Sequence, residues 1–223
     1  MMQVSVEIRR GNDRAVTRGV GFFTRHSFSF GSHYDPENVG FGPLVCHDDH
    51  LLAGGTGFDE HPHRDLDIVT WVLTGSLHHA DSDGHAHVVR PGEVQVLSAG
   101  SGVTHSEVAG PEGPARFVQA WLTPSELGGA PSYDVTAVDL APGELTLATT
   151  VGSARFLVAR LGAGDTVTLP DDPLQHVFVA GGALRRSSLA EPLADGDAFR
   201  IIDRPGLELT AAAPTELLVW AFP

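Results

Sequence analysis

The sequence predicts an all-β protein built from many short strands. Apolar and β-branched runs of about four to eight residues recur along the chain, and residues that favour turns end them. The 26 glycines and 15 prolines are spread over the 223 residues rather than gathered into one linker, so they cut the chain into short segments. Many short strands with frequent turns are typical of a sandwich or barrel, in which few strand edges stay exposed.

Four runs show the strand pattern in chain order: 67–73 (DIVTWVL), 92–97 (GEVQVL), 116–122 (RFVQAWL) and 174–180 (LQHVFVA). Valine, threonine and aromatic residues favour strands, and each run is bounded by glycine, proline or aspartate nearby. Trp71 lies in the first run and Trp121 in the third, and we expect both in the core.

A helical period is weak throughout the chain. Only the short segments 124–127 and 187–193 offer helix candidates, because glycine or proline interrupts every longer apolar pattern. The turn-rich stretch PSELGGAP at 124–131 interrupts the strand pattern. We therefore place a domain boundary there and predict two domains, 1–128 and 129–223.

A faint internal repeat supports two similar domains. Gly75 (VLTGSL) aligns with Gly182 (VAGGAL), and Gly92 (RPGEVQVL) aligns with Gly196 (ADGDAFRI). Each half then contains a strand, a glycine turn, a hairpin, and a further strand that follows glycine and an acidic residue.

The charge balance excludes several classes of partner. With 28 acidic against 14 basic residues, the formal net charge is −14, and such a surface repels the phosphates of nucleic acids. The first residues lack the apolar stretch of a secretory signal, and no run approaches the ~18 apolar residues of a membrane helix. The single cysteine, Cys46, excludes an intramolecular disulfide and a cysteine-rich zinc site. We expect a cytoplasmic protein without a direct nucleic-acid or membrane partner.

Two pairs of residues in the first half suggest a metal site. His61 and His63 lie in EHPHRD, and His105 and Glu107 lie in VTHSEV. On a strand, the i, i+2 spacing places both side chains of a pair on one face, so two neighbouring strands would present three imidazoles and a carboxylate together. These ligands suit Fe, Mn, Ni, Zn or Cu, and four protein ligands on an octahedral ion leave two positions open for chemistry.

Spacing alone leaves a second interpretation open, in which these histidines are solvated or hydrogen-bonded structural residues. His85 and His87 show the same spacing in DSDGHAHVV, and we expect them in a solvated hairpin because no carboxylate accompanies them. His78 and His79 are consecutive, so only one of them can point inward from a strand.

The run HPHRDLDIVTWVLTGSLHHADSDG, followed by RPGEVQVLSAGSGVTHSE, resembles the signature of the pirin family. The upstream segments HSFSFGSHYDP and FGPLVCHDD are similar to the start of that family's sequences. The resemblance is dense from about Thr24 to Pro124. It implies two tandem cupin barrels, with one metal ion in the N-terminal barrel held by His61, His63, His105 and Glu107.

The resemblance also implies a function. Family members bind iron, and some cleave the flavonol quercetin with dioxygen, which would make this chain an Fe(II)-dependent dioxygenase of a small aromatic substrate, with Glu107 as the general base. The alternative is a non-catalytic iron-binding regulator that acts through a protein partner. A cupin isomerase or epimerase that needs no dioxygen is a third reading. The chain departs from the family where Asp59 replaces a usual glycine; with Glu60 it adds two carboxylates, which we expect on a solvated loop.

The repeat predicts that the second half carries no metal. Transfer of the four ligand offsets to the second half gives Thr168, Pro170, Leu209 and Ala211, and none of these side chains replaces an imidazole or carboxylate ligand. We therefore expect a metal-free second barrel, in which His176 is structural.

Overall fold

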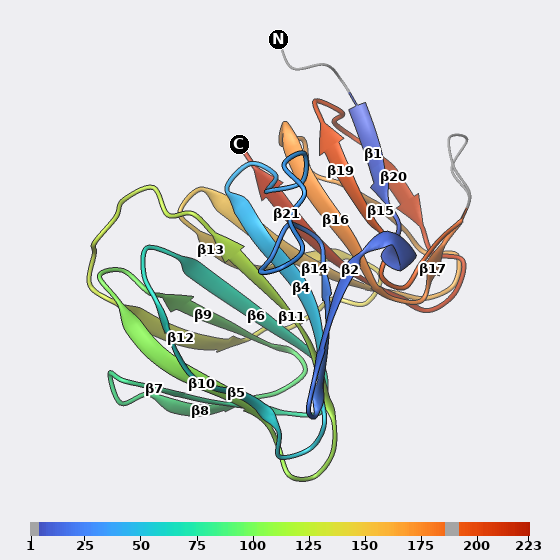
Figure 1. Ribbon diagram of the computed structural model, residues 1–223. Helices are drawn as coiled ribbons and strands as arrows, with labels where there is room; N and C mark the ends of the chain where they lie inside the picture. Colours follow the sequence, from blue (N-terminus) through green and yellow to red (C-terminus); the bar gives the residue numbers. More distant parts are fainter. Residues whose placement is uncertain (1–4, 186–191) are drawn as a thin grey trace. The chain divides into compact units, whose positions relative to one another are not determined.

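The computed structural model of the protein describes residues 5–185 and 192–223. Figure 1 shows an all-β chain, and its one short helix in the described part is the 3₁₀ turn η1 (Gly11–Asp13). The helix candidate at 124–127 is wrong, because these residues form bends in a loop. The candidate at 187–193 lies mostly outside the described residues. Within the described part, no helix has the length and apolar character needed to cross a membrane.

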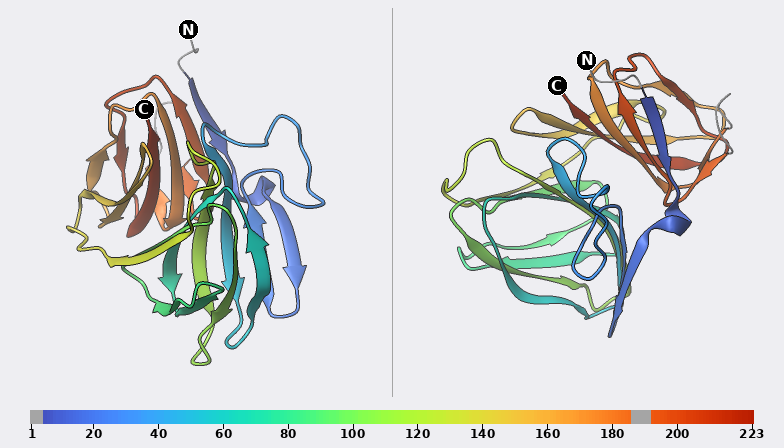
Figure 2. Two further views of the ribbon diagram at one scale, coloured as in Figure 1. Left: turned by 90° about the vertical axis from the view of Figure 1, so that its left-hand side faces the viewer. Right: turned by 45° about the horizontal axis from the view of Figure 1, so that its top comes forward.

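Residues Ala15–Val138 form the first compact unit, a cupin barrel of two antiparallel sheets. The larger sheet has the order β12-β9-β6-β11-β4-β3-β2, and the smaller has the order β5-β10-β7-β8. Figure 2 shows β2 and β3, in blue, as a hairpin at the edge of the larger sheet. The strands of the larger sheet are β2 (Ala15–Gly19), β3 (Phe22–His26), β4 (Leu44–Leu52), β6 (Asp67–Thr74), β9 (Glu93–Ser98), β11 (Ala115–Leu122) and β12 (Ser132–Ala137). Those of the smaller sheet are β5 (Gly57–His63), β7 (Leu77–Asp81), β8 (Ala86–Val89) and β10 (Val103–Ala109).

The core of this barrel follows from strand alternation. In β10 the burial pattern alternates strictly, with odd-numbered residues from Val103 to Ala109 buried, so His105 and Glu107 share the inner face with apolar neighbours. Trp71 is buried in the core as predicted, at 1% exposure.

The second compact unit is a cupin barrel formed by residues 5–14 and the described residues of 139–223. Its main sheet has the order β1-β19-β16-β21-β14-β13, with two small sheets of two strands each. The main strands are β1 (Ser5–Arg9), β13 (Leu145–Val151), β14 (Ala154–Leu161), β16 (Leu174–Gly181), β19 (Ala198–Ile202) and β21 (Thr215–Phe222). The small sheets pair β15 (Thr166–Thr168) with β20 (Glu208–Thr210), and β17 (Ala183–Leu184) with β18 (Leu193–Ala194).

These units divide the chain differently from the predicted ranges 1–128 and 129–223. The N-terminal strand β1 pairs with β19, so it belongs to the barrel formed mainly by the C-terminal half. Strand β12 pairs with β9 and extends the first barrel past the predicted boundary. Hydrogen bonding between strands distant in sequence produces both differences, and composition contains no signal for such pairing.

The structure supports the repeat between the barrels. Gly75 and Gly182 both have positive φ, 74° and 83°, and so do Gly92 and Gly196, 92° and 88°. This left-handed conformation favours glycine because it has no Cβ. The same turns therefore recur at the aligned positions of both barrels.

Candidate metal centre

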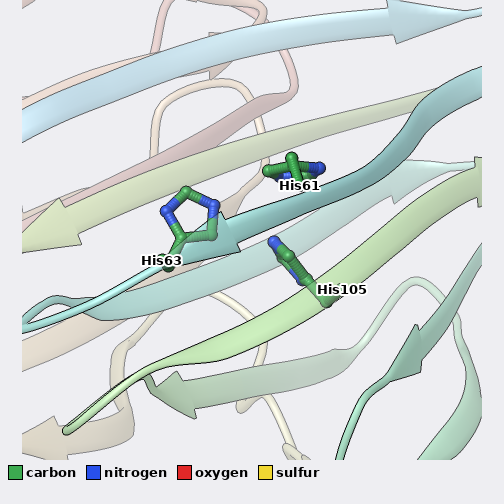
Figure 3. A group of neighbouring side chains, drawn as sticks. All are labelled: His61, His63 and His105. Carbon is green, nitrogen blue, oxygen red and sulfur yellow. The ribbon is translucent and has the colours of Figure 1, made fainter.

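Three histidines converge on the inner face of the smaller sheet of the first barrel. Strands β5 and β10 pair with His61 directly opposite His105, and His63 opposite Val103. One ring nitrogen from each of His61, His63 and His105 lies within 4.8 Å of the others. Figure 3 shows the three rings pointing toward one another from the two strands. The predicted side-by-side pairing of the two ligand strands is confirmed.

The free nitrogens of these rings fit a cation. The Nδ1–H of His61 donates to the backbone oxygen of Asp59 at 2.7 Å, which leaves Nε2 with its lone pair. The Nε2 atoms of His63 and His105 are buried and have no hydrogen-bond partner among the residues that the structure describes. Buried polar atoms are nearly always satisfied, so two such nitrogens in one cluster indicate a missing partner, and a metal ion supplies one.

A chain of hydrogen bonds sets the tautomer of His105. His79 Nε2 lies 3.2 Å from the carboxylate of Asp81, and His79 Nδ1 lies 3.4 Å from His105 Nδ1. Because the carboxylate accepts from Nε2–H, His79 Nδ1 accepts from His105 Nδ1–H. The lone pair of His105 is thereby fixed on Nε2. Such outer hydrogen bonds commonly orient metal-binding imidazoles.

Glu107 is fully enclosed, at 1% exposure, and its carboxylate faces two amides. Gln119 Nε2 donates to both carboxylate oxygens, at 2.8 and 3.0 Å, and Gln95 Nε2 lies 3.3 Å from one of them. Trp121 Nε1–H donates to Gln119 Oε1 at 2.8 Å, and Tyr133 O–H donates to Gln95 Oε1 at 3.0 Å, so both amides are oriented. Burial alone would raise the pKa of Glu107, but His105 and the Gln119 hydrogen bond lower it below its usual value.

Glu107 does not join the three-histidine cluster in the structure. It forms a second group of possible ligands with His79 and His105. Both ring nitrogens of His79 are already engaged, with Asp81 and His105. The three-histidine cluster, with its free Nε2 atoms, is therefore the better cation site of the two.

Burial keeps the imidazoles of His63 and His105 neutral, which is the form that binds metals. Burial, helped by the neighbouring His105 and His61, lowers the pKa of His63 to about 4. Burial also lowers the pKa of His105 to about 4, despite the opposing effect of Glu107. Both rings are unprotonated at neutral pH without any metal.

A pocket of about 250 Å³ opens beside the cluster, and His61 and Glu107 are part of its wall. Four aromatic residues line the pocket: Phe22, Phe30, Phe58 and Trp121. The remaining lining residues are polar: Thr17, Thr24, His26, Asp48, His50 and Gln119. An aromatic-lined pocket with a few polar groups is the usual form of a small-molecule site. Trp121 was expected in the core; it is half-buried, packs against the apolar cluster that contains Ile68 and Leu97, and also lines the pocket.

The structure also sorts the remaining histidines. His79 is buried and His78 exposed, as the alternation of a strand requires, and His85 and His87 are exposed as predicted. Sequence reasoning did not find the roles of His79, Asp81 and Gln119. The i, i+2 spacing of His79 and Asp81 is a signal that could have found the first two, whereas Gln119 has no such signal.

The fold and the site together define a bicupin with a centre for one divalent metal ion in its first barrel. A family model described as Pirin matches residues 11–122. A Mycobacterium tuberculosis protein that bears the name "Putative quercetin 2,3-dioxygenase" is 44% identical over 98% of this chain and 96% of that relative. A pirin-like protein of Caulobacter vibrioides is 34% identical over 87% of this chain and 90% of its own length.

The crystal structure of the bacterial pirin YhhW from Escherichia coli in complex with nickel(II) has a TM-score of 0.89 and 26% identity. The match covers 98% of this chain and 99% of that one. The chain belongs to the pirin family.

Proposed function

We propose that this protein is a metal-dependent dioxygenase of the pirin type, with Fe(II) as its metal, which cleaves a flavonol-like phenol such as quercetin. The observation that carries the proposal is the pair of free buried Nε2 atoms of His63 and His105 next to an aromatic-lined pocket. The name of the M. tuberculosis relative, which covers nearly the whole chain, supports the same substrate class.

In this proposal, His61, His63 and His105 hold the metal through Nε2, and Glu107 is the carboxylate partner. When bound, the metal supplies a Lewis acid and a template that brings a phenolic oxygen and dioxygen together. The lowered pKa of Glu107 keeps it ionised, so its carboxylate can accept the proton of the phenolic hydroxyl as general base. Gln119 and Gln95 hold this carboxylate in one orientation.

The aromatic side chains of the pocket position the substrate ring. Phe22 and Phe58 meet edge to face with their centroids 5.6 Å apart, and Phe30 meets Trp121 in the same way at 5.6 Å. The two aromatic pairs present apolar surface on which a flat ring can pack and from which water is excluded. At about 250 Å³ the pocket is smaller than the ~300–1,000 Å³ usual for drug-sized ligands. We therefore expect part of a three-ring flavonol to project from the pocket.

The test is oxygen consumption by protein loaded anaerobically with Fe(II) and then supplied with quercetin and air. We expect turnover by the wild type and a loss of at least about 100-fold in kcat for Glu107→Gln, the range usual for a general base. The matched control is Glu126→Gln, because Glu126 is an exposed carboxylate in a loop. Iron binding without oxygen consumption would contradict the dioxygenase and favour the non-catalytic regulator.

Parallel loading with Ni(II), Mn(II), Zn(II) and Cu(II) tests the choice of metal. The nickel(II) in the E. coli pirin makes nickel the first comparison. We expect turnover with iron to exceed that with each other metal, and equal or higher turnover with nickel would contradict the Fe(II) assignment.

A further inference from the structure

A polar track crosses the pocket wall on the side formed by β2, β3, β4 and β11. It consists of Thr17, His26, Asp48 and Gln119, which all line the pocket. His26 pairs across strands with Asp48, and Asp48 pairs with Gln119. Since Gln119 binds Glu107, the track begins beside the metal centre and ends at Thr17 on the edge strand β2.

Two short hydrogen bonds order the far end of this track. His26 Nδ1 lies 2.6 Å from Asp48 Oδ2, and His26 Nε2 lies 2.8 Å from Thr17 Oγ1. A distance of 2.6 Å is typical of a charge-assisted bond, so Asp48 is the carboxylate that accepts from Nδ1–H. His26 Nε2 accepts from the Thr17 hydroxyl when the ring is neutral and donates to it when the ring is charged, and in both cases the Thr17 oxygen keeps a lone pair for a further donor.

His26 and Asp48, in the middle of the track, are buried polar groups. His26 is 4% exposed and Asp48 is 3% exposed, and removing such groups from water is unfavourable unless partners compensate. The His26 ring also stacks on Phe30, with centroids 5.0 Å apart and planes 8° apart. The track thus presents a fixed acceptor, Thr17 Oγ1, in a wall that also contains four aromatic side chains.

We infer that Thr17, held by His26 and Asp48, accepts a hydrogen bond from a second hydroxyl group of the substrate. The pocket then selects aromatic compounds that carry one oxygen at the metal and a hydroxyl at the opposite end. This inference rests on the proposed function and specifies its substrate class as polyphenols with separated hydroxyl groups. His26 and Asp48 act through Thr17 and are positioning residues.

The experiment compares two flavonols that share the metal-binding group. 3-Hydroxyflavone carries only the 3-hydroxyl, whereas quercetin adds hydroxyls on both outer rings. Dissociation constants are measured by fluorescence on the zinc-loaded protein, in which the metal is redox-inert. We expect the wild type to bind quercetin more tightly than 3-hydroxyflavone. Thr17→Val should weaken quercetin binding about tenfold, the size expected for one hydrogen bond, and change 3-hydroxyflavone binding less than about twofold.

Two further variants separate recognition from folding. Thr17→Ser retains the hydroxyl and should restore quercetin binding to the wild-type value. Asp48→Asn keeps the shape of the side chain but no longer fixes the His26 tautomer, so it should weaken quercetin selectively, as Thr17→Val does. An equal effect of Thr17→Val on both flavonols, or no effect on quercetin, would overturn the inference.

The outcome for the dioxygenase is read separately, from oxygen consumption by the iron-loaded protein. Turnover without any selective effect of Thr17→Val would refute only the inference about the polar track. A selective effect without turnover would refute only the dioxygenase. If neither flavonol bound the wild type, both would be refuted.

Discussion

The two barrels share a strand framework but differ in what their inner faces carry. In the first barrel, β10 places His105 opposite His61 on β5. In the second barrel, β20 places Leu209 opposite Val167 on β15. The aligned glycine turns make β10 and β20 equivalent, so a strand pair that presents imidazoles in one barrel presents aliphatic side chains in the other.

The register in the second barrel differs by one residue from the offsets transferred along the sequence. By strand pairing, the positions equivalent to His61 and His63 are Val167 and Leu169, rather than Thr168 and Pro170. Thr168 is exposed, whereas Val167 and Leu169 are buried in an apolar cluster that also contains Leu209 and Ala211. A cluster of this kind offers no ligand atoms. The absence of a metal from the second barrel stays a prediction. The same strand framework supports a polar centre in one barrel and an apolar core in the other.

The largest expected effect is on metal binding. His105→Ala should lower metal affinity by at least about 100-fold, because it removes a ligand and leaves a gap in the cluster. Leu209→Met, at the equivalent position of the second barrel, should leave about one metal per chain. Elemental analysis of protein purified without chelators measures both, with His61→Ala as a second ligand variant. Metal retained by His105→Ala would break the assignment of the centre to the first barrel.

The next effect concerns the glycine turns that the barrels share. A Cβ at Gly75 would overlap the carbonyl oxygen of Pro114, and one at Gly182 would overlap that of Pro214. Both residues also have positive φ, so Gly75→Ala and Gly182→Ala should each lower the free energy of unfolding by about 2–4 kcal/mol.

The control for these turns is Gly113→Ala. In the described part of the chain, nothing lies within 4 Å of its added Cβ, so the change in unfolding free energy should stay within about 0.5 kcal/mol. Urea denaturation measures all three variants. A large loss for only one of the two turn glycines would show that the turns are not equivalent.

The next effect is on the pH dependence of stability, through His176, the buried histidine of the second barrel. Burial, with Arg200 and Arg14 nearby, lowers the pKa of His176 to about 3. Between the ordinary pKa of about 6.5 and this value the unfolded chain binds the proton and the folded chain does not, so stability falls as pH falls. From pH 6.5 to 5 the loss due to His176 is about 2 kcal/mol.

His176→Gln should therefore flatten the pH dependence of stability in the metal-free protein. The measurement is urea denaturation at several pH values between 5 and 7, and the slope is compared rather than the absolute stability. His63 and His105 contribute to the same slope from the first barrel, since their pKa values are also lowered. An unchanged slope in His176→Gln would show that this ring is not held neutral in the folded state.

The smallest expected effect is at Asp59 and Glu60, which lie in strand β5 and not in a loop as expected. Asp59 and Glu60 are exposed, and Asp59 holds His61 through its backbone oxygen rather than its carboxylate. The double variant Asp59→Asn, Glu60→Gln should therefore change metal affinity less than about threefold, as expected for solvated charges. Isothermal titration with zinc tests this, and a loss comparable to that of His105→Ala would place the carboxylates in the centre. Asp165 occupies the position in the second barrel that is equivalent to Asp59. An aspartate at this position therefore does not distinguish the metal-binding barrel from the apolar one.

The sequence by itself determined the fold class and the shared strand face within each pair of candidate ligands. Strand periodicity is a local property, so the spacing of His61 and His63, and that of His105 and Glu107, fixes which side chains share a face. The repeat of Gly75 and Gly182 was also readable, because their turns need a residue without a Cβ.

Only the tertiary structure decided which side chains complete the site and where the barrels divide. Asp48 on β4 pairs with Gln119 on β11, and these two strands lie far apart in sequence. The pairing of β1 with β19 likewise places strand β1 in the second barrel. Periodicity depends on a few neighbouring residues, so it was predictable from the sequence. Pairing between distant strands depends on the packing of the whole sheet, so it was not.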